Sequence, residues 1–300
     1  MDFFILIAII LYRPRVNWIV YAAYCFPGYQ TNCQKVIVTD MDNTLILPDK
    51  TMPKEIFPLI ATLRQKGIRF AAASARHYDV LYRMFEDAAG LMGFICDNGA
   101  YGEIDSQPFE GKPLSQEELA LIISVCEKIP GTHLSLSARN AMYYRGEPAK
   151  HDNEVTLSVN SLYHKCYISD LRDVPEAVFR ATLYDPAGAL THSLPVLKEA
   201  LGNCMSVTAT DYVCVDVMKT GVNKGTGLAA LQRHLQVKPE ETMAFGDYYN
   251  DIEMLDLAYY SYAVENAEEE VKKHCRFLTK SNAQRGVITA IASYLKENKL

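Results

Sequence analysis

The segment Lys35-Val-Ile-Val-Thr-Asp-Met-Asp-Asn-Thr44 contains the strongest indication of the fold of this 300-residue chain. The apolar run at 36–38 is rich in β-branched residues and ends in polar ones, which is typical of a buried strand that leads into a loop at Asp40. Asp42 follows two positions later, so both carboxylates are predicted just beyond the carboxyl end of this strand. In open α/β folds, ligands bind at that edge of the sheet. The segment therefore predicts a parallel sheet with a polar site at its rim.

Alternating strand and helix patterns surround this segment. Helical spacing over 54–66 ends before Gly67, a residue type that commonly follows the last turn of a helix. Strands are predicted at 68–73 and 93–96, and a turn at 97–99. After Gly221 the predicted elements are helices at 224–235, 249–256, 267–274 and 286–296, and strands at 243–245 and 262–264. Such alternation predicts a parallel sheet with crossover helices on its faces.

The pattern changes between about 105 and 217. Ser115 and Glu118 form a capping box at the start of a helix predicted over 114–128. Further predicted elements are short strands at 133–137, 141–144, 177–184, 206–209 and 212–217, and helices near 154–164 and 190–201. Short mixed elements predict an α+β insertion. We therefore expect an extension outside the fold at 1–34, a core in two parts at 35–104 and 218–300, and a smaller inserted domain at 105–217.

The composition is that of a globular protein. Hydrophobic residues make up 49% and charged residues 22%, which argues against intrinsic disorder. Thirty basic and 36 acidic side chains give a net charge of −6, so a broad surface that binds nucleic acid is not expected. A small anionic substrate needs only a few local cations and stays compatible with this charge.

The cysteines and the amino-terminal segment indicate the cellular compartment of the protein. None of the eight cysteines forms a C-x-x-C pair, so we interpret them as scattered reduced core residues of a cytoplasmic protein, with a Cys25–Cys33 disulfide as the alternative. The apolar run at 3–12 is interrupted at 13–15 by Arg-Pro-Arg. A membrane helix needs about 20 mostly apolar residues, so no stable membrane insertion is expected. Membrane association through residues 3–24 is the alternative.

Three further polar turns lie next to predicted strands or helices. Ser74-Ala75-Arg76 follows the strand at 68–73, Lys224 begins a predicted helix, and Gly246-Asp247-Tyr248-Tyr249-Asn250-Asp251 follows the strand at 243–245. Each turn alone is explained by a helix cap or a solvated side chain. The helix dipole disfavours a cation at a helix start, so Lys224 indicates an anionic partner. No P-loop or G-x-G-x-x-G motif is present.

Taken in order, these motifs resemble those of the haloacid dehalogenase-like superfamily of phosphohydrolases, in particular its Cof-type branch (type IIB), over residues 35–300. The positions that carry the resemblance are Asp40-Met41-Asp42-Asn43-Thr44 (D-x-D-G-T), Ser74, Asn98-Gly99-Ala100, Lys224, and Gly246-Asp247 with Asn250-Asp251 (G-D-x-x-N-D). Two positions depart from it: Asn43 replaces a Gly, and Ser74-Ala75-Arg76 replaces Thr-Gly-Arg. The resemblance implies a Rossmann-like α/β core with a parallel sheet and an inserted α+β cap of the C2B type.

The resemblance also implies roles for these residues. Asp40 would be the nucleophile that forms an aspartyl-phosphate, and Asp42 the general acid and base. Mg²⁺ would be held by Asp40, the backbone carbonyl of Asp42 and Asp247, with Asp251 orienting metal-bound water. Phosphate would be bound by Ser74, Lys224 and Asn250. Because dehalogenases lack the second aspartate, Asp42 favours a phosphatase or a phosphomutase.

The substrate is expected to be a small phosphorylated metabolite, such as a hexose or pentose phosphate. Candidate substrate contacts are Arg76, Asn98, Tyr143 and Arg145, of which Tyr143 and Arg145 are also compatible with solvated positions. The protein is expected to be a monomer or a small homo-oligomer. A phosphomutase of the same superfamily and a non-catalytic phosphosugar-binding regulator are the alternatives, although a pure binder has no need of the acid Asp42.

Overall fold

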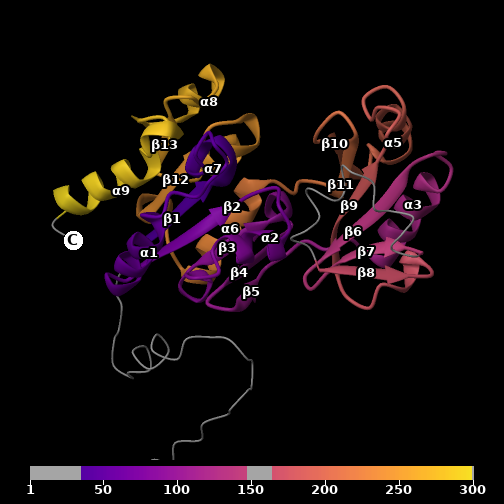
Figure 1. The fold of residues 1–300 in the computed structure, drawn as a ribbon, viewed down its shortest axis with the longest axis horizontal. Coiled ribbons are helices and arrows are strands. Elements are labelled where there is room, and N and C mark those ends of the chain that lie inside the picture. The colour runs from indigo at the N-terminus through magenta and orange to yellow at the C-terminus, as the bar shows by residue number, and fades with distance from the viewer. Residues whose placement is uncertain (1–34, 147–163, 299–300) are drawn as a thin grey trace, which may run out of the picture. The chain divides into compact units, whose positions relative to one another are not determined.

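The computed structural model describes residues 35–146 and 164–298 (Figure 1). They form an eight-stranded sheet in the order β14-β13-β12-β1-β2-β3-β4-β5 and a six-stranded sheet, here called the cap sheet, in the order β10-β11-β9-β6-β7-β8. Both sheets belong to the same compact unit of the chain. The predicted α/β class is confirmed.

The eight-stranded sheet is parallel from β14 to β3 and antiparallel from β3 to β5. Its strands are β1 Lys35–Asp40, β2 Ile68–Ala73, β3 Gly93–Cys96, β4 Tyr101–Ile104, β5 Gln107–Phe109, β12 Thr242–Gly246, β13 Tyr260–Val264 and β14 Phe277–Thr279. Strand β1, indigo in Figure 1, and β12, from the second part of the core, are neighbours because they pair with each other. The central strand β1 thus joins the two parts of the core predicted from the sequence.

Both faces of this sheet are covered by helices. The helices are α1 Ile56–Gln65, α2 Tyr78–Met84, α6 Lys224–Leu235, α7 Ile252–Asp256, α8 Glu269–His274 and α9 Gly286–Glu297. Ile37 of β1 belongs to one apolar cluster, whereas Val36 and Val38 belong to another on the opposite face. Because alternate side chains of a strand point to opposite faces, the unbroken apolar run of β1 is what a doubly covered strand requires.

The cap sheet is antiparallel except for the parallel pair β7–β8. Its strands are β6 His133–Ala138, β7 Met142–Arg145, β8 Lys165–Ile168, β9 Val178–Tyr184, β10 Met205–Ala209 and β11 Cys214–Lys219, and its helices are α3 Gln116–Cys126 and α5 Ser193–Leu201. Helix α3 begins with both hydrogen bonds of the predicted capping box between Ser115 and Glu118.

Some elements differ from the sequence prediction. The predicted boundary at 105 would place β5 in the inserted domain, but β5 pairs with β4 in the eight-stranded sheet. The connecting residues Asp105 and Ser106 both have positive φ (52° and 59°), a hairpin conformation for which Asp-Gly or Asn-Gly is the usual sequence. Ser106 stands where Gly is usual, so the sequence gave only half of the hairpin signal. Strands β8 and β14 and helix α2 were also not predicted.

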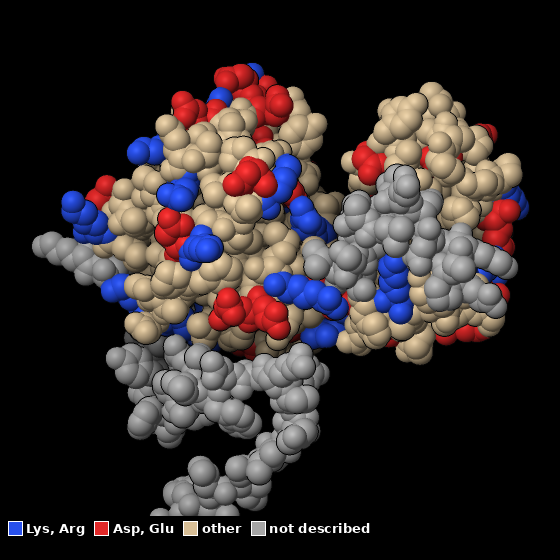
Figure 2. All heavy atoms as spheres, viewed as in Figure 1, with Lys and Arg blue, Asp and Glu red and all other residues tan. Residues whose placement is uncertain are grey.

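Several other predictions can be compared with the structure. In the described ranges, no helix is long and apolar enough to cross a membrane. Six cysteines there are free, of which Cys96 and Cys126 are buried but Cys204 is exposed, so its prediction as a core residue is wrong. The 1–34 extension, including Cys25 and Cys33, and nearly all of the helix predicted near 154–164 lie outside the described residues. Figure 2 shows acidic and basic side chains interspersed on one face.

Substitution of Gly99 can test how closely the turn after β3 packs against the start of helix α6. A Cβ atom at Gly99 would lie 2.1 Å from the carbonyl oxygen of Asn223, and φ is +95°. We expect Gly99→Ala to lower the free energy of unfolding by more than the ~1–2 kcal/mol that left-handed backbone alone costs. Gly131→Ala is the matched control, because Gly131 has φ of +76° and no atom within 4 Å of such a Cβ. Equal losses for the two variants in denaturant unfolding would contradict the close packing.

Candidate active site

The strand order brings the sequence motifs to one edge of the sheet. Asp40 is the last residue of β1 and lies opposite Ala73, so Ser74 begins the loop beside it. On the other side Thr39 pairs with Phe245, which places Asp247 one residue beyond the end of β12. Parallel neighbours end at the same edge, and that edge collects the polar loops.

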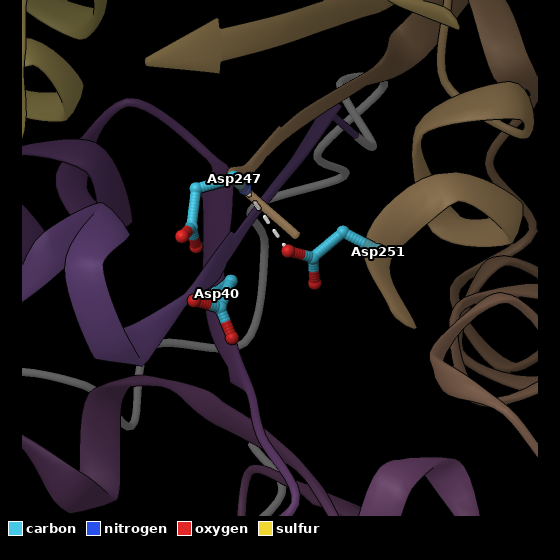
Figure 3. A group of neighbouring side chains, drawn as sticks. All are labelled: Asp40, Asp247 and Asp251. Carbon is cyan, nitrogen blue, oxygen red and sulfur yellow. Dashed lines mark hydrogen bonds between the residues drawn. The ribbon is translucent and has the colours of Figure 1, made fainter. Parts of the chain in front are cut away.

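Three carboxylates converge at this edge. Asp40, Asp247 and Asp251 each offer an oxygen, and these oxygens lie within 4.8 Å of one another (Figure 3). All three side chains are buried. Lys224, which is 2% exposed, donates to Oδ1 of Asp40 at 2.5 Å and to Oδ1 of Asp251 at 2.7 Å. The structure therefore unites Asp40, Lys224, Asp247 and Asp251 from distant parts of the chain.

Local hydrogen bonds hold the carboxylates in place. Oδ2 of Asp251 accepts from the backbone N–H groups of Asp247 (3.0 Å) and Tyr248 (3.1 Å). A Cβ atom at Gly246 would lie 2.6 Å from the Cβ of Asp251, which explains the glycine in this motif. Thr44 donates to Oδ1 of Asp247 at 2.7 Å. Thr44 belongs to the first motif, and its contact with Asp247 was not predicted from the sequence.

The electrostatics of this group reflect crowding of like charges away from water. Burial raises the pKa of Asp40 well above its ordinary value, with Asp251 and Asp247 adding to the effect and Lys224 opposing it. Burial also raises the pKa of Asp247 to about 6, against the hydrogen bond from Thr44. Burial alone would lower the pKa of Lys224, but the carboxylates of Asp251 and Asp40 raise it above its ordinary value. Lys224 is therefore a cation here.

The donor set fits a hard divalent cation. Three buried carboxylates face one ammonium group, so the cluster carries negative charge when all are ionised, and Mg²⁺ prefers carboxylate oxygens. Both oxygens of Asp251 accept hydrogen bonds from the protein, so Asp40 and Asp247 are better disposed to bind an ion directly. The Asp42 side chain is not part of the three-carboxylate group.

Asp42 instead pairs with Arg76. The guanidinium donates from Nε to Oδ2 at 3.0 Å and from Nη2 to Oδ1 at 2.7 Å, and the Asp42 side chain is 44% exposed. The chain turns directly after Asp42, where Asn43 has φ of +60°, a conformation that Asn and Gly adopt more readily than other residues. The replacement of Gly by Asn at this position thus preserves the turn.

The remaining predicted site residues fall into two groups. Oγ of Ser74 accepts from the N–H of Arg76 at 3.2 Å, and Asn250 donates to Oδ1 of Asn98 at 3.3 Å, so these four residues belong to the loops of the core. Their roles toward phosphate and substrate stay predictions.

Tyr143 and Arg145 lie in the cap sheet. The Tyr143 hydroxyl donates to Glu176 at 2.7 Å, and Arg145 donates to Glu127 at 2.7 Å. Arg145 and Glu127 line a cavity of about 370 Å³ whose walls come from the cap sheet and its helix α3. Both predicted substrate residues thus bond to acidic side chains of the same inserted segment, and their roles toward the substrate stay predictions.

Comparison with known proteins agrees with this fold. Residues 37–291 match the model of the haloacid dehalogenase-like hydrolase family, and the chain belongs to this family. It is 28% identical over 264 residues to the 5-amino-6-(5-phospho-D-ribitylamino)uracil phosphatase YbjI of Escherichia coli, covering 87% of this chain and 96% of that protein.

Two further proteins are similar. The chain is 31% identical over 224 residues to the HMP-PP phosphatase of Citrobacter koseri, covering 72% of this chain and 79% of that protein. The crystal structure of SMU.1108c from Streptococcus mutans has a TM-score of 0.73 and 29% identity, covering 87% of this chain and 99% of that one. The resemblance seen in the sequence is therefore confirmed for the family and the fold.

The raised pKa of Asp247 predicts how pH and metal act on stability. Because the folded-state pKa is about 6 and the ordinary value is 3.8, this group stabilises chelator-treated protein below about pH 4, and that contribution is lost as the pH rises through about 6. Mg²⁺ needs ionised carboxylates, so the stabilisation by added Mg²⁺ should grow over the same range. At about a hundred times the Kd it amounts to roughly 2–3 kcal/mol.

Thermal unfolding with and without Mg²⁺, at about pH 5 and about pH 7.5, measures this effect. Asp247→Asn should abolish most of the Mg²⁺-dependent shift, whereas Asp49→Asn, at an exposed position, should keep it. A shift of the same size at both pH values would show that these carboxylates do not bind the ion.

Proposed function

We propose that this member of the haloacid dehalogenase-like family is a Mg²⁺-dependent phosphatase of small phosphorylated metabolites. The observation that carries the proposal is the buried Asp40 at the sheet rim, paired with Lys224 and grouped with Asp247 and Asp251. Hydrolysis of phosphate monoesters is among the slowest uncatalysed reactions. Several groups must act together on it, and this rim supplies them.

Asp40 is the proposed nucleophile. Its carboxylate attacks phosphorus and displaces the leaving oxygen, which gives an aspartyl-phosphate and divides one difficult displacement into two easier ones. A carboxylate and a phosphate dianion repel each other, and the Lys224 ammonium offsets that repulsion at the point of attack. Mg²⁺, held by Asp40, the Asp42 carbonyl and Asp247, would supply further neutralisation of the phosphoryl charge. Asp251 fixes Lys224 through its 2.7 Å hydrogen bond.

Asp42 is the proposed general acid and base. It protonates the leaving alkoxide and then accepts a proton from the water that attacks the aspartyl-phosphate, a contribution of about 10²–10⁴-fold. Its exposed side chain can reach a bound substrate, and the two-point bond from Arg76 orients its carboxylate. Ser74 and Asn250 are proposed to hold phosphoryl oxygens from the neighbouring loops.

The proposed substrates are phosphate monoesters of sugars and similar polyhydroxylated metabolites. The name of the Escherichia coli relative describes a substrate with a phosphorylated ribityl chain, which supports this chemical class. A cytoplasmic location belongs to the same proposal, since the six cysteines of the described residues are free thiols.

Replacement of the nucleophile is the first test. Asp40→Asn should lower the Mg²⁺-dependent hydrolysis of p-nitrophenyl phosphate by at least about 10³-fold, since an amide oxygen cannot form the covalent intermediate. Asp49→Asn, an exposed aspartate nine positions further on, is the matched control and should keep full activity. Parent-like activity of Asp40→Asn would show that the nucleophile is a different group.

A panel of phosphorylated metabolites tests the substrate class. With protein beginning near Asn32, we expect release of inorganic phosphate from hexose or pentose phosphates, and loss of that release when a chelator removes Mg²⁺. Transfer of phosphate to a second sugar instead of water would identify a phosphomutase. Binding of phosphosugars without turnover would indicate a regulator.

A further inference from the structure

Arg180 of strand β9 links the cap sheet to the core. Its side chain is 9% exposed, and Nη2 lies 3.1 Å from Oδ1 of Asp97, in the turn that follows β3. Nη1 lies 3.3 Å from Oδ2 of Asp216 on β11 and donates to the carbonyl oxygen of Ala75 at 2.6 Å. One guanidinium from the cap sheet thus contacts two separate loops of the core.

These two loops are the ones that position Arg76. Ala75 lies between Ser74 and Arg76, so Arg180 grips this loop at its middle residue. The N–H of Asp97 donates to the carbonyl oxygen of Arg76 at 3.0 Å, and the N–H of Asn98 donates to that of Ser74 at 3.0 Å. Arg76 in turn holds both carboxylate oxygens of Asp42. A short series of contacts therefore runs from the cap sheet to Asp42.

The surroundings of Arg180 make its geometry specific. Ser137 donates to Oδ2 of Asp97 at 2.9 Å, and Thr182 donates to Oδ1 of Asp216 at 2.6 Å. Both carboxylates are 2% exposed, so the cluster is held away from water by hydrogen bonds with fixed directions. Buried ion pairs add little net stability. The planar guanidinium holds its five donors in a fixed fork, whereas the three donors of an ammonium rotate on a flexible stem, so Lys at this position would not fix the same set of acceptors.

We propose that Arg180 is a positioning residue that, through Ala75 and Asp97, directs Arg76 at the carboxylate of Asp42. This inference rests on the proposed function, in which Asp42 protonates the leaving group. It makes the orientation of the acid depend on a residue of the cap sheet. A displacement of about 1 Å in a reacting group can cost about 10²-fold in rate, so a modest shift of this loop has a measurable effect.

Leaving groups of different basicity test the proposal. A p-nitrophenolate leaves without a proton, whereas the alkoxide of a sugar phosphate needs one from Asp42. The value of kcat/KM reports on steps up to cleavage of the ester bond, so the later hydrolysis of the aspartyl-phosphate does not enter. We expect Arg180→Lys to lower kcat/KM for the best sugar phosphate by about 10–100-fold and for p-nitrophenyl phosphate by less than about 3-fold. Arg76→Lys should lower kcat/KM for the same sugar phosphate at least as much, because it removes the two-point bond to Asp42 directly.

A matched control separates this role from general attachment of the cap sheet. Arg139 also crosses from the cap sheet to the core, where it donates to Glu103 at 2.8 Å. Its hydrogen-bond partners are Tyr101, Glu103 and Asn140, and its guanidinium lies 4.4 Å from the centre of the Tyr78 ring, so these contacts lie outside the loop at 74–76. Arg139→Lys should leave the ratio of the two kcat/KM values unchanged. The double variant Arg180→Lys/Arg76→Lys should lose little more than the larger single effect, because both act along one path.

A second variant covers the case in which Arg180→Lys does not fold. Asp97→Asn removes the ion pair but keeps the backbone N–H that serves Arg76, and Asn tolerates the φ of +47° at this position. It should show the same selective loss on sugar phosphates.

Three results would overturn the positioning role: equal losses on both substrates, the same selective loss for Arg139→Lys, or fully additive effects in the double variant. If the parent protein hydrolyses neither substrate, the proposed function itself is wrong; if it hydrolyses both and the ratio stays constant, only the role of Arg180 is wrong.

Discussion

The structure depends on a buried ammonium group that joins two carboxylates from opposite ends of the core. Lys224 bonds to Asp40, which is 184 positions away, and to Asp251. Buried ions are costly unless they are paired in good geometry, so the ends of β1 and β12 and the start of α6 must be placed closely enough for these hydrogen bonds to form. The glycines at 99 and 246 allow this approach, since a Cβ at either would collide with Asn223 or with Asp251. Packing and charge thus impose the same arrangement.

The same arrangement explains why the site is poised to accept a cation. Burial raises the pKa values of Asp40 and Asp247, which means that the fold holds these groups in a state that disfavours their charge. A divalent ion reverses that preference by binding the ionised forms. Burial of these carboxylates therefore lowers the local stability of their ionised forms, although the site needs them ionised. Such a conflict between stability and function is common at functional sites.

The sequence could predict what is encoded locally. The strands at 68–73 and 93–96 were predicted at their observed bounds, and the capping box at Ser115 was found from two residues. The convergence of Asp40, Lys224 and Asp247 was implied by the resemblance to the family, and their places at strand and helix ends are compatible with it. The β4–β5 hairpin was not predicted, because both Asp105 and Ser106 adopt positive φ although Ser106 stands where such a turn usually has Gly. Arg180 gave no signal either, since its partners are 105 and 36 positions away.

The departures from the family motifs show where the chemistry tolerates change. Asn43 keeps the left-handed turn that a glycine would provide. Ala75, where the motif has a glycine, is absent from the residues with positive φ, so its backbone needs no glycine. What the position must supply is a carbonyl oxygen that faces Arg180, and any residue type can supply it. At 76, by contrast, the two hydrogen bonds to Asp42 require a guanidinium. The motif therefore constrains the backbone at position 75 and the side chain at position 76.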